Sequence, residues 1–398
     1  MTKAQSPPPQ TVHAADPIPE VALLFGRSTS WGQGIIRGIM QYAQQHGPWR
    51  FLVDSVGTSS YSPDEPDLPL DWQGHGVIGN IKTQSLSKLQ HVHCPMVNIA
   101  APWGNTPPEL PHVITDYVAA LDMAVQHMLD RGFRQFVYVE RPSDQANEAW
   151  VKDRVAGAGG ECWTFDIHAL HALDPASKQR TLAEWLKQLP APVALVCVSD
   201  AAGYLLIQTC ATWQIRVPEE VAIISIGRDQ LLCEISQPQL TYVKLATERQ
   251  GYRAAAALDR LMHGQPLESQ IEYIPPLRVV SRRSTDTLAI ADPDVAEVLH
   301  FIQQHAPKGL TVKQILARFP FSRWWLEQQF RQCLGRSPAE EIRRVRIAHL
   351  KHLLQTSEMT ILEIAEAAGF ENTEYMSTYF RRDVGMTPRA YRRKSRSR

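Results

Sequence analysis

Residues 326–338, LEQQFRQCLGRSP, have a close counterpart fifty positions later in residues 376–388, MSTYFRRDVGMTP. Both copies place an apolar residue four positions before an aromatic one, a glycine five positions after it, and then a Ser-Pro or Thr-Pro pair. Each copy also follows a short amphipathic segment and a turn, which is the outline of a helix-turn-helix. Two such motifs in tandem can place two recognition helices on one face of DNA. The duplication therefore predicts a DNA-binding module at this end of the chain.

The charge distribution agrees with this prediction once the chain is divided. The 398 residues hold 41 basic and 41 acidic side chains, so the net charge is zero. Residues 291–398 hold 18 basic and 12 acidic side chains, which leaves 23 basic and 29 acidic ones in the preceding part. A basic module on an acidic body is expected when only one end of a protein contacts phosphate.

Length and composition bound the rest of the chain. A chain of 398 residues is too long for one ordinary core and fits two or three domains. The six cysteines are scattered without a C-x-x-C pair, which favours reduced thiols in a cytoplasmic protein over disulfides or a zinc site. We expect no signal peptide and no membrane span, because no stretch of about 18 apolar residues exists. Residues 1–18 are expected to form a disordered tail.

Residues 19–285 alternate short apolar runs with amphipathic helical patterns. The runs predict strands at 21–25, 51–54, 76–79, 96–99, 135–139, 193–198 and 221–226. The clearest helical patterns cover 34–45, 118–129, 201–213 and 248–262. Continuous β-branched runs joined by helices indicate parallel sheets that are covered on both faces. For a body of this length, two sheets in two lobes fit better than one.

Several phrases in this body carry a family resemblance: Asp116 after Val113-Ile114-Thr115, VSDAA at 198–202, VPEEVAIISIG at 217–227, and PPLRVVSRRST at 275–285. They resemble the ligand-binding domains of LacI/GalR-type repressors and of their periplasmic sugar-binding relatives. The resemblance covers nearly all of 19–285 and implies an α/β, two-lobed, periplasmic-binding-protein-like domain that binds a small effector. The N-terminal DNA-binding headpiece of such repressors has no counterpart here, because the first predicted strand begins at about residue 20.

Residues 295–393 resemble the DNA-binding domains of AraC/XylS-type activators. In that pattern each recognition helix ends on an aromatic residue, followed by a glycine and Ser/Thr-Pro; here these are Phe330, Gly335, Ser337-Pro338 and Phe380, Gly385, Thr387-Pro388. The resemblance implies an all-α tandem helix-turn-helix domain at 294–398. A linker at 286–293 is expected before it, where apolar content drops and Pro293 begins a helix.

By this resemblance, the positions six and two residues before each aromatic contact DNA bases. They are Trp324 and Gln328 in the first copy, and Glu374 and Thr378 in the second. Gln can pair with adenine, Glu can accept from cytosine, and an aromatic ring or the Thr methyl can meet the thymine methyl. The neighbouring arginines are expected to hold phosphates without reading sequence: Arg323, Arg331, Arg381 and Arg382. Glu327, Thr373 and Ser377 complete the outward faces; the alternative is that all these side chains form only a solvated helix surface.

Two positions depart from the pattern. Where the second turn has Gly369, the first has Pro320, which cannot adopt a positive φ, so the first turn must close differently. The pair Trp324-Trp325 is also unusual, and we expect one of the two rings to pack toward the connecting helix at 339–354.

In two-lobed domains of this kind the effector contacts residues at the carboxyl ends of strands. The resemblance gives as candidates Arg27, Ser30, Trp31, Asn80 and Trp103 in the first lobe, and Asp116, Arg141, Asp200 and Arg228 in the second lobe or the crossovers. An aromatic ring can stack on a pyranose face, and carboxylates can accept hydrogen bonds from paired hydroxyls. Asp116 and Asp200 also stand where aspartate caps helix N-termini, and that alternative stays open.

The identity of the effector stays open because two acceptor positions have changed. The family commonly has an acidic residue after the strand that ends Ser225-Ile226, whereas this chain has Gly227-Arg228. Asn80 likewise stands where an acidic residue is found in pentose-responsive members. Xylose or a related pentose, a different sugar, or an anion suited to Arg228 would each fit.

Other chemical signals are weak. Gly32, Gly34 and Gly38 do not match the dinucleotide pattern G-x-G-x-x-G and indicate helix packing instead. No Ser-His-Asp set, paired acid or phosphate-binding loop emerges from the spacing. We therefore expect no catalytic residue, no metal and no cofactor.

The sequence predicts a transcription regulator and not an enzyme: an activator of sugar catabolism genes that is switched by an effector in its N-terminal domain. The expected partners are double-stranded operator DNA, a second copy of the chain, and RNA polymerase if it activates. The alternatives are a sugar-binding or sugar-processing protein with a helical assembly tail, and a repressor that acts by occlusion. Two recognition helices favour the regulator over the assembly tail, while only the operator's position separates an activator from a repressor.

Overall fold

The computed structural model describes residues 18–53, 68–100, 106–140, 145–287, 289, 292–357 and 359–396. The chain divides into two compact units: Met1–Thr115 with Ala246–Ile274, and Asp116–Leu245 with Pro275–Arg398. Residues 1–17 of the predicted tail lie outside the described residues, as do Trp103 and Arg141.

The first unit is built on a six-stranded sheet in the order β11-β5-β4-β3-β1-β2. The strands are β1 (Glu20–Leu24), β2 (Arg50–Val53), β3 (Gly76–Gly79), β4 (Met96–Asn98), β5 (His112–Thr115) and β11 (Ile271–Ile274), and every pairing between them is parallel. Two long helices of this unit, α1 (Ser30–His46) and α8 (Thr247–Met262), pack against each other, and the short α2 is Thr83–Leu86. At Gly38 a Cβ would overlap the backbone oxygen of Glu248, which confirms that this glycine serves helix packing.

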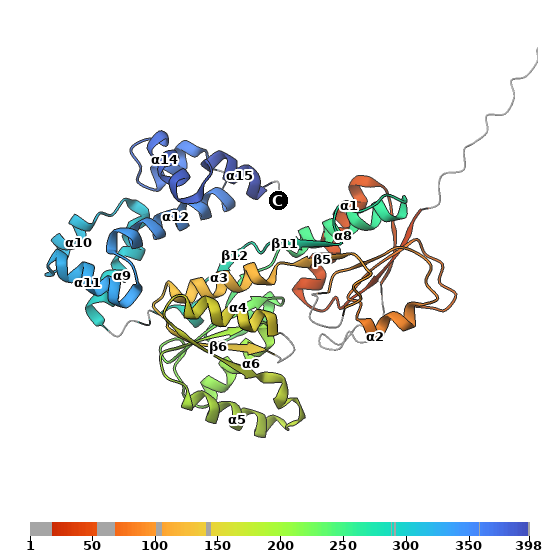
Figure 1. Ribbon diagram of the computed structural model, residues 1–398, viewed down its shortest axis with the longest axis horizontal. Helices are drawn as coiled ribbons and strands as arrows, with labels where there is room; N and C mark the ends of the chain where they lie inside the picture. The colour runs from red at the N-terminus through yellow and green to blue at the C-terminus, as the bar shows by residue number, and fades with distance from the viewer. Residues whose placement is uncertain are drawn as a thin grey trace, which may run out of the picture. The chain divides into compact units, whose positions relative to one another are not determined.

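The second unit holds another six-stranded sheet, in the order β12-β10-β9-β8-β6-β7. Its strands are β6 (Gln135–Glu140), β7 (Glu161–Asp166), β8 (Val193–Cys197), β9 (Val221–Gly227), β10 (Thr241–Lys244) and β12 (Arg278–Val280). β12 runs antiparallel to β10, so the prediction of purely parallel sheets is wrong at this edge. Figure 1 shows α3 (Tyr117–Leu129) and α4 (Gln145–Ala156) on one side of the sheet, with α5 (Pro175–Gln188) and α6 (Asp200–Thr212) on the other. A short helix, α7 (Gln230–Ile235), follows β9.

The last part of the second unit is helical. It contains α9 (Pro293–His305), α10 (Val312–Arg318), α11 (Arg323–Leu334), α12 (Pro338–Thr356), α13 (Ile361–Ala367), α14 (Thr373–Val384) and α15 (Pro388–Arg396). These helices enclose two separate apolar cores, one for each helix-turn-helix. The connecting helix α12 contributes Ile342 to the first core, and Leu350 and Leu354 to the second.

The predicted fold class is confirmed: two sheets in an α/β body precede a tandem helical domain. Every strand predicted from an apolar run is present, with its bounds displaced by at most one residue. Among the described residues, no helix is long and apolar enough to cross a membrane.

Candidate DNA interface and effector site

The first recognition helix, α11, is fixed at both ends by its own sequence. Ser322 caps the N-terminus by accepting a hydrogen bond from the backbone N–H of Trp325 at 3.1 Å. Gly335 ends the helix in the left-handed conformation (φ 70°), which glycine adopts without strain. Leu326 and Phe330 are fully buried, so the opposite face of α11 is turned outward.

The side chains predicted to contact DNA from α11 lie on this outward face. Trp324 is 75% exposed, an unusual position for a large apolar ring. Gln328 and Arg331 are also exposed. Arg323 forms an ion pair of 3.2 Å with Glu327, one turn along the helix.

The two adjacent tryptophans behave differently. Trp325 stacks on Phe321, with ring centroids 4.2 Å apart, and packs against the first core, to which the connecting helix contributes Ile342. Trp324 stays on the surface. Trp325 therefore packs inward, while the expected contact of one ring with the connecting helix itself stays a prediction.

The second recognition helix, α14, is built in the same way. Asn372 caps it by accepting from the backbone N–H of Tyr375 at 2.7 Å, and Gly385 ends it at φ 75°. Met376 and Phe380 are buried. The residues predicted to contact DNA lie on the remaining surface of α14. Four of them are exposed, namely Glu374, Thr378, Arg381 and Arg382, and two are partly exposed, namely Thr373 and Ser377.

Sequence reasoning missed Tyr375, which is 57% exposed on α14 directly after Glu374. Its ring centroid lies 6.4 Å from that of Tyr379. Its place beside Glu374, a predicted base-contacting residue, was the sequence signal that could have added Tyr375 to the predicted DNA-facing surface of α14.

The two turns close differently, as expected from Pro320 and Gly369. In the second motif Gly369 adopts φ 65° after α13. In the first motif α10 ends instead at Phe319, in extended conformation (φ −114°), and the backbone N–H of Phe321 donates to the Phe319 carbonyl at 2.8 Å. The turn of the first motif therefore closes without a residue of positive φ.

The second turn is tied to the connecting helix by a residue that the sequence did not single out. Arg346 of α12 donates to the backbone carbonyls of Ala368 (3.0 Å) and Gly369 (2.8 Å). Its guanidinium also lies 3.9 Å from the ring centroid of Phe370. Arg346 thereby fixes the position of α13 and α14 on α12.

The described effector candidates of the first unit lie at the carboxyl edge of its sheet. Arg27 follows β1, and Asn80 follows the parallel neighbour β3, so both loops leave the same edge. Arg27 is exposed. Ser30 and Trp31 begin α1, and the ring of Trp31, only 6% exposed, meets Phe25 edge to face at 6.0 Å. Little of the Trp31 ring is therefore left to stack on a sugar.

A buried polar network lies under this edge, and sequence reasoning missed it. Gln250 of α8 donates to the backbone oxygens of Ile99 (3.2 Å) and Val113 (2.9 Å). Asn98 donates to the carbonyl of Ile81 (2.8 Å) and accepts from the N–H of the same residue (3.1 Å). These two amide side chains fix the loops at this edge of the sheet. The sequence signal that could have revealed them was an amide residue at the end of an apolar strand, as Asn98 is at the end of β4.

Asp116 lies at the carboxyl edge of the second sheet, because α3 runs from there back to the start of β6. Its Oδ1 accepts from the backbone N–H of Ala119 at 2.9 Å, so the predicted N-cap is present. A cap of this kind occupies one carboxylate oxygen and leaves Oδ2 for another donor.

Asp200 follows β8 at the same edge and is 2% exposed. Ser199 caps α6, so the alternative of Asp200 as N-cap is wrong. The Asp200 carboxylate instead accepts from Ser225 Oγ (2.5 Å) and from the backbone N–H groups of Arg228 (2.5 Å) and Asp229 (2.6 Å). Burial raises the pKa of Asp200, while these hydrogen bonds oppose that rise. Asp200 thus positions the loop after β9, and Arg228 with it.

Two families of known proteins match separate parts of the chain, the α/β body and the helical domain. Residues 125–285 match the model of a periplasmic binding protein-like domain, and residues 315–394 match that of a helix-turn-helix domain. The xylose operon regulatory protein of Haemophilus influenzae is 29% identical over 385 residues, which cover 94% of this chain and 98% of that protein. Its namesake from Escherichia coli K12 is 26% identical over 385 residues, 94% and 96% of the two chains.

A solved structure supports the same relationship. That of a xylose-binding transcription activator shares 26% sequence identity and a TM-score of 0.61, and covers 95% of this chain and 98% of that one. Both domains thus match in the expected order, and these relatives are regulators rather than enzymes. The chain is a transcription regulator that joins a periplasmic-binding-protein-like domain to an AraC-type tandem helix-turn-helix domain.

Proposed function

We propose that this regulator activates sugar catabolism genes in response to an aldopentose, xylose or a close relative of it. The observation that carries the proposal is similarity along 94% of the chain to two xylose operon regulatory proteins. The chemistry of the predicted effector residues is compatible with a polyol. Asp116 offers a carboxylate oxygen to a sugar hydroxyl, while Arg27, Ser30 and Asn80 can donate hydrogen bonds.

Within this proposal, the remaining effector residues have unequal roles. Trp103 and Arg141 complete the predicted set. Arg228 faces the ligand from a loop that Asp200 holds, so Asp200 acts as a positioning residue and not as a direct contact. Trp31 forms an apolar wall.

A melting experiment with the full-length protein tests the effector. D-xylose should raise the melting temperature by mass action, by an amount that corresponds to about 2.7 kcal/mol when the sugar is present at about 100 times its Kd. Asp116→Asn should abolish this rise and leave the melting temperature without sugar nearly unchanged, because asparagine caps a helix as well as aspartate does. Asp174→Asn, at the exposed N-cap of α5, is the matched control and should keep the full rise.

The same experiment separates the candidate ligands. A panel of D-xylose, L-arabinose, D-ribose and D-glucose ranks the sugars. If none of them moves the melting temperature, the sugar proposal fails, and phosphorylated sugars become the next ligands to test because of Arg228.

For DNA, we propose that Trp324, Gln328, Glu374 and Thr378 read bases, and that the arginines of α11 and α14 hold phosphates. The exposed pair of Arg323 and Glu327 is a weak constraint, since exposed ion pairs contribute about 0–1 kcal/mol. Arg323 can therefore leave Glu327 for a phosphate. Two recognition helices of one module would enter successive major grooves, about 34 Å apart.

A binding selection on random DNA tests this assignment. Gln328→Ala and Thr378→Ala should each relax base preference at one position, by about 1–3 kcal/mol. Arg381→Ala should instead weaken binding to all sequences alike and flatten the salt dependence. Unchanged site preference in both alanine variants would show that the register proposed along these helices is wrong.

The remaining parts of the proposal concern assembly. The protein would act in the cytoplasm as a dimer formed through the N-terminal body, with two DNA-binding modules on repeated half-sites. Activation would require contact with RNA polymerase; a reporter gene that falls in expression when the protein is added would indicate a repressor instead.

A further inference from the structure

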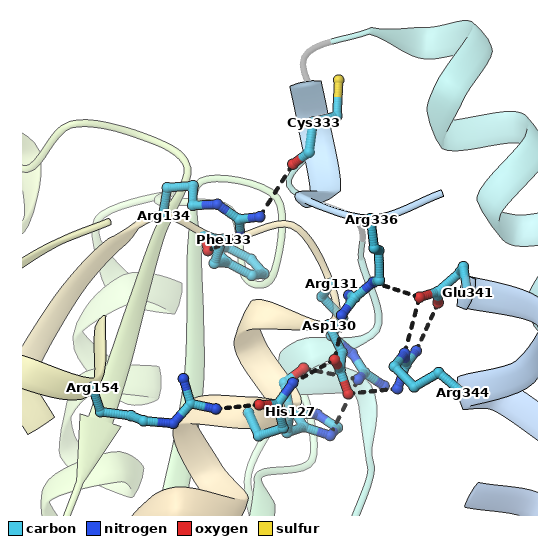
Figure 2. Close-up of polar contacts among 11 residues, drawn as sticks. His127, Asp130, Arg131, Phe133, Arg134, Arg154, Cys333, Arg336, Glu341 and Arg344 are labelled. Atoms are coloured by element: carbon cyan, nitrogen blue, oxygen red, sulfur yellow. Dashed lines mark hydrogen bonds and ion pairs between the residues drawn. The ribbon is translucent and has the colours of Figure 1, made fainter. Parts of the chain in front are cut away.

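The last turn of α3, with the loop that follows it, contacts the chain at Thr285 and Ala289, which leads to the DNA-binding module. It also contacts the first helix-turn-helix itself (Figure 2). Four of its residues take part: His127, Asp130, Arg131 and Arg134. All of these contacts lie within the second unit. The helix that begins at Asp116 therefore ends on the DNA-binding module.

Asp130 makes the ionic part of this contact. Its carboxylate accepts from Arg344 Nη1 at 2.5 Å and forms a longer ion pair of 3.4 Å with Arg336 Nη2. Both arginines also reach the fully buried Glu341, each at 2.7 Å. The Asp130 side chain is only 14% exposed, so these charges are largely shielded from water.

Among the four ion-paired side chains, the charges balance only when Asp130 of the sensor body is included. Arg336, Glu341 and Arg344 all belong to the DNA-binding module and together carry one net positive charge. Asp130 of the sensor body supplies the missing negative charge. Without Asp130 the two arginines would share the single carboxylate of Glu341, and the loss of a partner is costly for a charge that is shielded from water.

Arg134 contacts the first recognition helix itself. Its Nη2 donates to the backbone carbonyl of Cys333 at 3.2 Å. This carbonyl is in the last turn of α11, where helix carbonyls lack donors within the helix and favour a positive charge. The sensor body thereby holds the carboxyl end of a DNA-reading helix.

Arg131 holds the chain that leads to the module. Its Nε donates to the carbonyl of Thr285 at 2.8 Å, and its own carbonyl accepts from the N–H of Ala289 at 2.8 Å. The covalent path between the domains and their ionic contact thus depend on two adjacent residues, Asp130 and Arg131, directly after the end of α3.

α3 is suited to transmit a displacement along its length. The 13 residues from Tyr117 to Leu129 span about 20 Å at about 1.5 Å per residue. Its inward face is buried in the sensor body at Ala120, Ala124 and Met128. A helix packed in this way moves as a whole, since close-packed interiors shift between discrete arrangements instead of deforming locally.

We propose that α3 couples effector binding to DNA binding, with Asp116 at the effector end and with Asp130 and Arg134 docking the first helix-turn-helix at the other. This inference rests on the proposed function, since it requires an effector that contacts Asp116. Breaking the dock should uncouple the two activities without abolishing either one.

Hydrogen exchange measured by mass spectrometry on the full-length protein tests the dock without any ligand. Asp130→Asn and Arg134→Gln should speed exchange in peptides from residues 331–346, by roughly tenfold or more, and leave α14 unchanged. Asp122→Asn is the matched control, because Asp122 is on the same helix but pairs with Arg154 of the sensor body at 3.0 Å. Equal exchange in the Asp130→Asn and wild-type proteins would overturn the dock.

A double variant tests whether Asp130 and Arg344 act together. If their contact is shared, Asp130→Asn combined with Arg344→Gln should speed exchange little more than Arg344→Gln alone. Fully additive effects would show that the two residues act independently and would also overturn the proposal.

The coupling is tested with D-xylose and a DNA fragment that the wild-type protein selects. Xylose should change the operator Kd of the wild-type and Asp122→Asn proteins by one common factor. In Asp130→Asn this factor should fall toward one while xylose still raises the melting temperature. A wild-type protein that ignores xylose would refute the proposed function, whereas an Asp130→Asn protein that keeps the full factor would refute the coupling through α3 alone.

Discussion

His127 has a partly buried imidazole, and its tautomer follows from its two neighbours. Arg131 Nη1 lies 3.1 Å from Nδ1, and because arginine can only donate, Nδ1 must accept. Nε2 then carries the proton and donates to Thr285 Oγ1 at 2.9 Å. Burial lowers the pKa of His127 well below its ordinary value, and the positive charges of Arg131 and Arg344 lower it further.

This arrangement makes stability depend on pH in one direction. Below about pH 6.5 the unfolded chain protonates His127 while the folded protein does not, so the free energy of unfolding falls by up to about 1.4 kcal/mol per pH unit. Relative to His127→Gln, the wild-type melting temperature should therefore decline between pH 7.5 and pH 5.5. The exposed His300, changed to Gln, provides the control, and its difference from wild type should stay nearly constant. Parallel pH profiles for wild type and His127→Gln would contradict this account.

The position of Asp200 could be predicted from the sequence, but its role could not. Its place after an apolar strand predicted a residue at the carboxyl edge of a sheet, and the structure confirms that place. Its partners Ser225 and Arg228 come from the next strand and its loop. No local pattern distinguishes a cap, a ligand contact and a buried anchor for a loop, because the three differ only in tertiary neighbours.

Elements whose signals are local were predicted well. The recognition helices follow from caps and from buried residues four positions apart, both of which lie within one stretch of sequence. Five strands were missed: β5, β7, β10, β11 and β12. β5 and β10 lie inside the sheets, but polar residues shorten their apolar runs, as at His112 and Thr241. β7, β11 and β12 are edge strands, and Tyr273 on β11 is exposed. An edge strand needs no continuous apolar run, so the pattern that revealed the central strands was absent.

The two helix-ending glycines offer a comparison at the scale of one element. Gly369 and Gly385 both have positive φ, so alanine at either one costs about 1 kcal/mol in backbone strain. At Gly369 a Cβ would also lie 2.6 Å from the carbonyl oxygen of Lys308, whereas at Gly385 it would meet no described atom within 4 Å. Gly369→Ala should therefore lower the melting temperature more than Gly385→Ala and weaken operator binding. Equal losses in the two variants would show that the contact with Lys308 does not matter.

For the whole molecule, the two units could not be read from the order of the sequence, because each unit is built from two separate stretches of the chain. The first unit includes Ala246–Ile274, which follows a long segment of the second unit, Asp116–Leu245, in the sequence. Within the first unit, the approach of α1 to α8 depends on glycines more than two hundred residues apart. Repeats and apolar runs predicted two lobes and a tandem module, since each of these has its own local pattern. The dock between Asp130 and Arg344 spans 214 positions and has no pattern at either end, so the sequence alone did not reveal it.

A regulator whose sensor and DNA module share these contacts must obey linkage between its two ligands. If xylose changes the operator Kd by some factor, the operator must change the xylose Kd by the same factor, typically about 5–150-fold. Calorimetric titration of xylose into the full-length protein, with and without bound operator, should therefore give the ratio that operator titrations give with and without xylose. Asp130→Asn should reduce both ratios together, because a ligand can shift an equilibrium only through its different affinities for the two states. A xylose affinity that operator DNA leaves unchanged would mean that the domains are joined by the chain without being coupled, even if each of them binds its own ligand.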